Sequence, residues 1–255
     1  MQRPSAGVAE DAAEVTPNSE GAMMHVGSPE TNAQVFVVIA ALNESEVIGD
    51  VVRDLTLDYP YVVVVDDGSS DRTGPIALNH GAIVLRHAIN RGQGAALQTG
   101  IAYALKAGAR YIVTFDADGQ HDKHDIPALL APILEGRAEF CLGSRFLEES
   151  SSVPWARRVL LFFAVLFTRI TSGLRVTDAH NGLRAFSHRA ASTIDLQLDR
   201  MAHASEIIDQ IRHSGLPFCE VPVHVRYTDY SLAKGQRGVA AFRVAFDYLI
   251  ARVFR

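Results

Sequence analysis

Short apolar runs alternate with segments of helical periodicity along the first 145 residues. Such a run, bounded by turn residues, is typical of a strand buried on both faces. Strands that alternate with helices predict a parallel, doubly wound α/β sheet with right-handed crossovers. The predicted strands are 34–41, 61–65, 82–85, 111–115 and 139–142, and the predicted helices are 43–57 with Asn43 as N-cap, 71–81 capped by Asp71, 92–107 and 126–134.

Beyond Arg145 the pattern changes. Residues 155–171 predict a largely apolar helix bordered by arginines, and 204–214 predict another helix between strands at 183–186 and 218–225. We therefore expect one domain over 34–237. A polar tail without apolar periodicity precedes it (1–33, predicted to be disordered), and an amphipathic C-terminal helix follows it (238–255).

Composition narrows the function classes. Of 255 residues, 48% are hydrophobic and 21% charged, which is ordinary for a soluble protein. Most of the net charge of −5 lies in residues 1–33, so the remainder is near neutral, which argues against nonspecific nucleic-acid binding. No segment reaches the ~20 apolar residues of a membrane span, and the tail lacks a signal-peptide pattern. Cys141 and Cys219 lie in strand-like runs, which favours reduced thiols in a cytosolic protein.

Two acid clusters follow apolar strands. The motif Asp116-Ala117-Asp118 ends the strand at 111–115, and Gln120 offers a further oxygen. Ligands of open α/β sheets bind at the carboxyl edge of the strands, where oxygen-rich loops suit a hard divalent cation. A simple strand-ending turn is the alternative, because Asp and Gly favour turns. We weigh metal binding above the turn because a second acid cluster follows another strand.

That second cluster is Asp66-Asp67-Gly68, at the end of the strand at 61–65. An acid there can accept a hydrogen bond from the base or ribose of a nucleotide. A hairpin turn is the competing interpretation, but no second strand follows immediately. The loop Asn90–Gly94 lacks the third glycine of a dinucleotide fingerprint, so phosphate proximity and plain helix entry stay equal alternatives.

Further polar residues complete the candidate site. Arg145 leaves a strand at the same edge and can neutralise a diphosphate or form a surface salt bridge. Asp178, His203 and Glu206 are candidate acid/base groups, although a histidine in such company is more often structural. A basic, aromatic loop precedes the last helix and can be either a lid over an anion or a solvated loop; it contains Arg226, Tyr227, Tyr230, Ser231, Lys234 and Arg237.

Taken in order, these motifs resemble family 2 glycosyltransferases of the GT-A (Rossmann-like) fold. The likeness is greatest to the branch of dolichyl-phosphate mannose synthase and polyprenyl-phosphate glycosyltransferases, over roughly 35–237. The Asn-Glu of the family's first motif stands at Asn43-Glu44, with Ala40 in place of proline and Leu42 in place of tyrosine. The remaining matches are Val65–Ser69, Asp116 to Asp118, Gly143–Arg145, Asn181–Arg184 and Tyr230–Lys234.

The resemblance implies roles for residues of this chain. It implies a Mg²⁺ or Mn²⁺ ion held by Asp116, Asp118 and Gln120, and catalysis by Asp118, Arg145 and Asp178. Nucleotide contacts are implied for Ala40, Leu42, Glu44, Val65, Asp67, Asp116, Ala117, Asp118 and Arg145, and acceptor or lid contacts for Asn181, Arg184, Glu206, Arg226 and Lys234.

The expected reaction is inverting sugar transfer from a GDP- or UDP-linked donor to a polyprenyl phosphate. The enzyme is expected on the cytoplasmic face of a membrane, through peripheral contact or a membrane-protein partner. A phosphate acceptor is already a dianion near neutral pH and needs no base, whereas a sugar hydroxyl would need one, with Asp178 or Glu206 as candidates. A nucleotidylyltransferase is disfavoured because no Gly-rich loop follows the first strand, and a non-catalytic nucleotide-sugar scaffold stays the third alternative.

Overall fold

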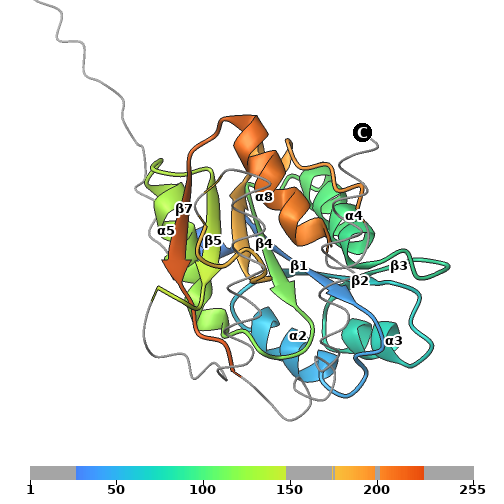
Figure 1. Ribbon diagram of the computed structural model, residues 1–255. Coiled ribbons are helices and arrows are strands. Elements are labelled where there is room, and N and C mark those ends of the chain that lie inside the picture. Colours follow the sequence, from blue (N-terminus) through green and yellow to red (C-terminus); the bar gives the residue numbers. More distant parts are fainter. Residues whose placement is uncertain (1–26, 148–173, 175, 199–201, 227–255) are drawn as a thin grey trace, which may run out of the picture.

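The computed structural model describes residues 27–147, 174, 176–198 and 202–226. Seven strands of this part form one mixed sheet in the order β3-β2-β1-β4-β6-β5-β7 (Figure 1). All neighbouring strands run parallel except at β6, which is antiparallel to both β4 and β5. The strands are β1 Val35–Ala41, β2 Tyr61–Asp66, β3 Ile83–Arg86, β4 Tyr111–Asp116, β5 Phe140–Ser144, β6 Arg184–Ser187 and β7 Phe218–Pro222.

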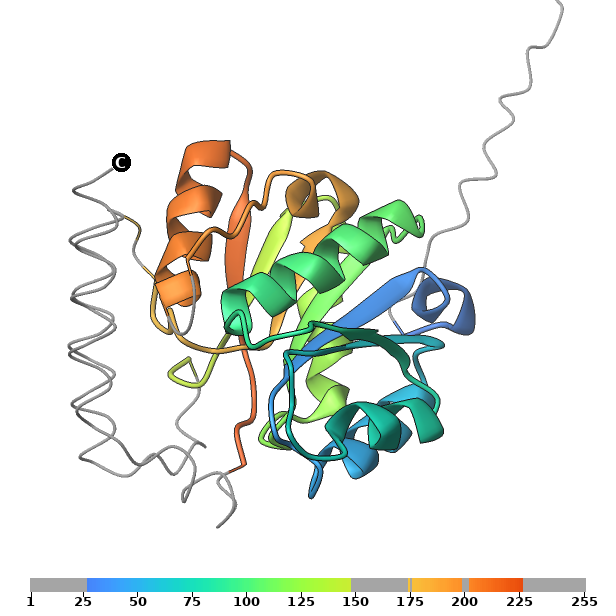
Figure 2. The ribbon, with the colours of Figure 1, turned by 90° about the vertical axis from the view of Figure 1, so that its right-hand side faces the viewer.

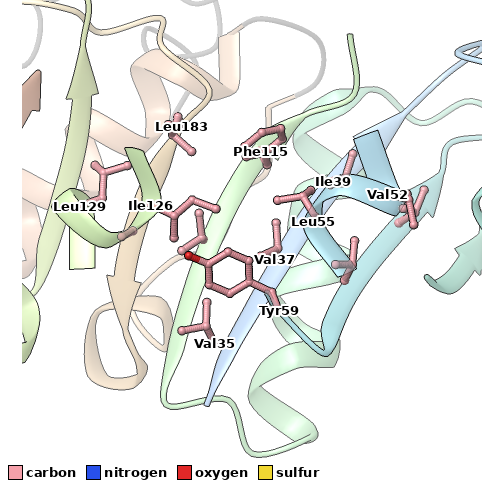
Figure 3. Packing of buried hydrophobic residues seen from close by; sticks show 14 of the residues in the cluster. Val35, Val37, Ile39, Val52, Leu55, Tyr59, Phe115, Ile126, Leu129 and Leu183 are labelled. Atoms are coloured by element: carbon pink, nitrogen blue, oxygen red, sulfur yellow. The ribbon is translucent and has the colours of Figure 1, made fainter. Parts of the chain in front are cut away.

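Helices cover both faces of the sheet, as Figures 1 and 2 show. On one face alternate β1 residues, Val35, Val37 and Ile39, share one core with α2 and α5 (Figure 3), and α3 packs against α2, β2 and β3. On the other face Phe36 and Val38 share a second core with residues of α4, α7 and α8. The described helices are α1 Pro29–Asn32, α2 Ile48–Thr56, α3 Thr73–Asn79, α4 Gln93–Lys106, the 3-10 turn η1 Lys123–Asp125, α5 Ile126–Leu134, α7 His188–Ala191 and α8 Ala202–Ser214.

The strand register brings the two acid clusters to one edge. Ala41 at the end of β1 pairs with Asp66, and Ala40 pairs with Asp116 on the other neighbouring strand. Because all three strands run in the same direction, the loops that follow them leave the sheet side by side. The doubly wound, mainly parallel sheet predicted from the sequence is confirmed.

Two local predictions differ from the structure. Asn43 does not cap a helix: α2 begins at Ile48, and Asn43 adopts a left-handed φ of 53°. Asn tolerates this left-handed conformation better than most residues. In it, the Asn43 amide oxygen accepts a hydrogen bond from the backbone N–H of Ser70. At the end of the predicted tail, residues 29–32 form α1, with Thr31 buried.

Several predicted features lie at or beyond the limits of the described chain. The predicted helices at 155–171 and 238–255 lie outside it, as does Lys234. None of the described helices is long and apolar enough to cross a membrane. Cys141 and Cys219 occupy paired positions on β5 and β7, and their sulfur atoms lie 2.6 Å apart. Their reduced state stays a prediction.

Candidate active site

The carboxyl end of β4 carries the Asp116-Ala117-Asp118 motif. Asp116 is partly exposed, and its Oδ2 lies 2.9 Å from Nε2 of His121. Burial opposes ionisation of Asp116, but the His121 contact, together with the charges of Arg184 and His203, lowers the pKa of this carboxyl. Asp116 is therefore held as a carboxylate.

Asp118 behaves in the opposite way. Burial, followed by the negative charge of Asp116, raises the pKa of Asp118 to about 6, and Glu44 adds to this effect. The backbone N–H of Gln120 donates to Asp118 Oδ1 over 3.1 Å, which only partly offsets the repulsion. The site therefore gathers negative charge from three acids, which a bound cation would offset.

The residues at this edge fit a hard divalent cation. Asp116, Asp118 and Gln120 supply oxygen atoms, the ligand type that Mg²⁺ and Mn²⁺ prefer. In the described part of the chain no three His, Cys, Asp or Glu side chains are placed to hold a metal by themselves. This is compatible with a Mg²⁺-type site, which typically uses one or two carboxylates and completes its coordination with waters and substrate phosphates.

The loop before β6 closes over Asp116. A Cβ atom added to Gly182 would lie 2.2 Å from both carboxylate oxygens of Asp116, so only glycine fits there. Arg184, predicted near the acceptor, is buried beneath this loop and donates to the carbonyl oxygen of Ala179 over 3.1 Å. Burial lowers the pKa of Arg184 to about 10, and the negative charges of Asp116 and Asp178 partly offset this lowering. Because a pKa of about 10 lies well above neutral pH, the side chain stays cationic.

Asp67, the predicted base and ribose contact, is buried and already bound by protein donors. Its Oδ1 lies 2.7 Å from Nδ1 of His87 and accepts from the backbone N–H of Arg91, and its Oδ2 accepts from the N–H of Gly92 over 2.7 Å. Gly92 is the N-cap residue of α4. The loop 90–94 therefore leads into the first turn of α4, which was one of the two alternatives for it. The backbone N–H groups of Arg91 and Gly92 at this helix start bind the Asp67 carboxylate.

The first loop lies beside these residues. Ala40 pairs with Val65 and Asp116 across neighbouring strands, which places the predicted nucleotide contacts at one edge. Glu44 is buried, and its backbone N–H donates to Thr73 Oγ1 over 2.8 Å. Ala117 is buried at the end of β4.

Arg145 and Asp178 form a buried ion pair. Asp178 Oδ2 accepts from Arg145 Nε over 2.6 Å and from the Arg145 backbone N–H over 3.2 Å. The structure thus rejects a surface salt bridge for Arg145, since both side chains are almost wholly buried. Within the described part of the chain, Asp178 Oδ1 and Nδ2 of Asn181 on the same loop are buried without a hydrogen-bond partner.

Two predicted acceptor-side residues have structural contacts instead. Glu206 is buried and accepts from the backbone N–H groups of Gln197 and Leu198. Arg226 forms an ion pair with Asp122, on the loop that follows the acid motif. Glu206 stays a predicted acceptor-side residue, and its carboxylate holds the loop that precedes α8.

Sequence reasoning missed the histidine partners of the acids. His87 contacts Asp67 and His121 contacts Asp116, and both are buried. His121 directly follows Gln120, but the position carries no pattern that distinguishes it from a structural histidine. Contact between His87 and Asp67 depends on the pairing of β2 with β3, which spans a crossover.

Comparisons with known proteins identify a matching family model, relatives and structures of the same fold. The family model described as glycosyl transferase family 2 matches residues 36–194. The chain is 32% identical to the UDP-N-acetylglucosamine–dolichyl-phosphate N-acetylglucosaminyltransferase of Methanococcus voltae, over 86% of this chain and 96% of the relative. It is 28% identical to the polyprenol monophosphomannose synthase of Mycolicibacterium smegmatis, over 83% and 84%. The structure of Mycobacterium tuberculosis glucosyl-3-phosphoglycerate synthase with Mn²⁺ and UDP-glucose has a TM-score of 0.68 and 20% identity, covering 89% of this chain and 81% of that one.

Proposed function

The chain belongs to glycosyl transferase family 2, and we propose that it transfers a sugar, with inversion, from a nucleotide diphosphate sugar to a polyprenyl phosphate. It is a glycosyltransferase, and its fold is that of the GT-A enzymes. The observation that carries the proposal is the accumulation of Asp116, Asp118 and Glu44 at the carboxyl edge, where the pKa of Asp118 is raised to about 6. Negative charge gathered in this way suits a cation that accompanies a diphosphate.

The donor would lie across the ends of β1, β2 and β4. Glu44 and Asp67, with Leu42 of the first loop and Val65 near the end of β2, would orient the nucleoside. The protein donors around Asp67 fix its carboxylate in one orientation, which favours a positioning role. Asp116, Asp118 and Gln120 would hold Mg²⁺ or Mn²⁺, which offsets charge on the leaving diphosphate when bound.

Arg145 would add positive charge at the same diphosphate, and Asp178 fixes its guanidinium. In the proposed displacement, an acceptor oxygen forms a bond to the anomeric carbon as the bond from that carbon to the diphosphate breaks. The nucleoside diphosphate leaves with the bonding electron pair. Remote binding of donor and acceptor would supply the alignment.

A phosphate acceptor suits the site better than a hydroxyl. A hydroxyl would need a base, but Asp178 is ion-paired with Arg145 and Glu206 binds backbone N–H groups. A phosphate monoester has a second pKa of about 6 and attacks without a base at neutral pH. The names of the two relatives also point to polyprenyl acceptors, which supports action at a membrane surface, for which we propose the cytoplasmic face and peripheral contact or a membrane-protein partner.

The test is transfer from UDP-linked and GDP-linked sugars to a short polyprenyl phosphate in detergent with Mn²⁺. We expect turnover with one donor class, loss of turnover in Asp118→Ala, and wild-type turnover in Asp50→Ala, which removes an exposed acid of α2 that pairs with Arg53. Transfer to a sugar hydroxyl but not to the phosphate would contradict the acceptor assignment. Nucleotide binding without any turnover would favour a scaffold.

A further inference from the structure

Glu220 lies on β7, outside every motif that the sequence singled out. Its Oε1 accepts hydrogen bonds from the backbone N–H of Thr177 (2.8 Å), from Thr177 Oγ1 (2.9 Å) and from the backbone N–H of Asp178 (3.2 Å). Its Oε2 lies 3.0 Å from the same Thr177 nitrogen. A carboxylate only accepts hydrogen bonds, so every contact draws this loop toward β7.

The loop that Glu220 holds contains the partner of Arg145. Asp178 Oδ2 accepts from both Nε and the backbone N–H of Arg145. The backbone N–H of Asp178 is one of the donors to Glu220, so the carboxylate on β7 anchors the residue that orients the arginine. The edge strand of the sheet is thereby connected to the arginine assigned to the diphosphate.

A second connection runs through hydroxyl groups. Thr177 Oγ1 donates its only hydrogen to Glu220, so at the 2.7 Å contact Ser144 Oγ must be the donor. Ser144 Oγ in turn accepts from the backbone N–H of Phe146. The hydrogen bonds therefore form one chain, in which each group donates to the next from Phe146 through Ser144 and Thr177 to Glu220. Each bond in such a chain strengthens the next.

We infer that Glu220 is a positioning residue for Arg145, fixing the guanidinium for the donor's diphosphate through Thr177 and Asp178. This inference rests on the proposed function. Glu220 itself does not touch the substrate in this arrangement. Its effect should therefore fall on recognition of the second phosphate of the nucleotide and leave the nucleoside contacts at Asp67 unchanged.

Glu220→Gln tests this with little change of shape. The amide keeps one acceptor oxygen, but it loses the negative charge and places an NH₂ group, which cannot accept, where Oε2 lies 3.0 Å from the Thr177 nitrogen. The control is Glu139→Gln, just ahead of β5, which removes a carboxylate of the same sheet that contacts Ser187 and Arg189. Thr177→Val is a milder variant, because it removes only the hydroxyl connection.

The readout is the ratio of affinities for nucleoside diphosphate and monophosphate in Mn²⁺, measured with UDP against UMP and GDP against GMP. We expect Glu220→Gln to weaken diphosphate binding about tenfold, as for one lost charge-assisted hydrogen bond, with monophosphate binding unchanged. Thr177→Val should move the ratio in the same direction by less, and Glu139→Gln should leave it at the wild-type value.

A double-mutant cycle with Arg145→Ala separates positioning from a structural role. If Glu220 acts through Arg145, the ratio in the double variant equals that in Arg145→Ala alone. Additive losses, or an equal loss of both affinities with a lowered Tm, would overturn the inference. If Arg145→Ala leaves the wild-type ratio unchanged, the assigned role of Arg145 in the proposed function fails first, and the inference falls with it.

Discussion

Replacing Asp118 with asparagine is expected to stabilise the metal-free protein while removing its response to Mn²⁺ and nucleotide. Burial and the neighbouring Asp116 raise the pKa of the Asp118 carboxyl from 3.8 to about 6. The folded state therefore binds this proton more tightly than the unfolded state, so stability is lost as pH rises from about 4 to about 6. A difference of about two pKa units corresponds to roughly 3 kcal/mol above that window.

Asparagine has the same shape, cannot ionise, and keeps an oxygen for the N–H of Gln120. At about pH 7.5 in EDTA we expect the free energy of unfolding of Asp118→Asn to exceed that of wild type by about 1–3 kcal/mol. The upper end of this range is the full cost of ionising Asp118 in the folded state. For a domain of this size each kcal/mol is worth roughly 2–4 °C in Tm. Near pH 4 the advantage should disappear, because Asp118 is then protonated in the folded wild type.

The assay is urea unfolding and thermal denaturation at both pH values, with and without Mn²⁺ and nucleoside diphosphate. Asp71→Asn is the matched control of opposite sign. Burial would raise the pKa of the Asp71 carboxyl, but hydrogen bonds from Thr73 and Ser45 outweigh this and lower the pKa to about 2. Loss of the Asp71 negative charge should therefore destabilise the folded protein. Asp118→Asn that is less stable than wild type in EDTA, or that keeps the full Mn²⁺ response, would refute the reasoning.

Three further outcomes follow from the same site. Gly182→Ala should abolish the Mn²⁺-dependent thermal shift, because a Cβ atom would lie 2.2 Å from both oxygens of Asp116; a wild-type shift would contradict this. Asp178→Asn should lower the free energy of unfolding by about 3 kcal/mol in urea titrations, since it removes the buried negative charge that pairs with Arg145 Nε. Burial lowers the pKa of His180 to about 4, so the unfolded state binds its proton more tightly and stability falls as pH drops from ~6.5 toward 4. This contribution is about 2 kcal/mol between pH 7 and pH 5 and should be absent in His180→Gln.

Much of the fold was predictable from local pattern. The apolar runs at 34–41, 61–65 and 111–115 correspond to β1, β2 and β4, and the helix predicted at 126–134 matches α5. These elements are buried on both faces or along one stripe, so their periodicity is strong. Local reasoning failed at Asn43, where contacts with Ser69 and Ser70 from another loop outweigh the capping preference.

For the candidate site, too, the sequence predicted some features and left others to the tertiary structure. Sequence alone placed the acids at one edge, because parallel strands present their carboxyl ends together. It could not show that Glu206 binds the backbone at Gln197 and Leu198, or that Asp178 meets Arg145. A side chain's polar character gives candidate roles, but which partner it meets depends on how the loops are brought together.

The sequence by itself determined the fold class, and it predicted the edge of the sheet for the chemistry and the residues proposed to bind a cation there. These follow from hydrophobic periodicity and from the chemistry of single side chains. Only the tertiary structure decided which of those side chains are free for substrate and which hold the protein together. The insertion of antiparallel β6 between β4 and β5, and the placement of β7 beside β5, bring Asp178 and Glu220 to Arg145. No local pattern encodes that arrangement, because these contacts join segments more than thirty residues apart.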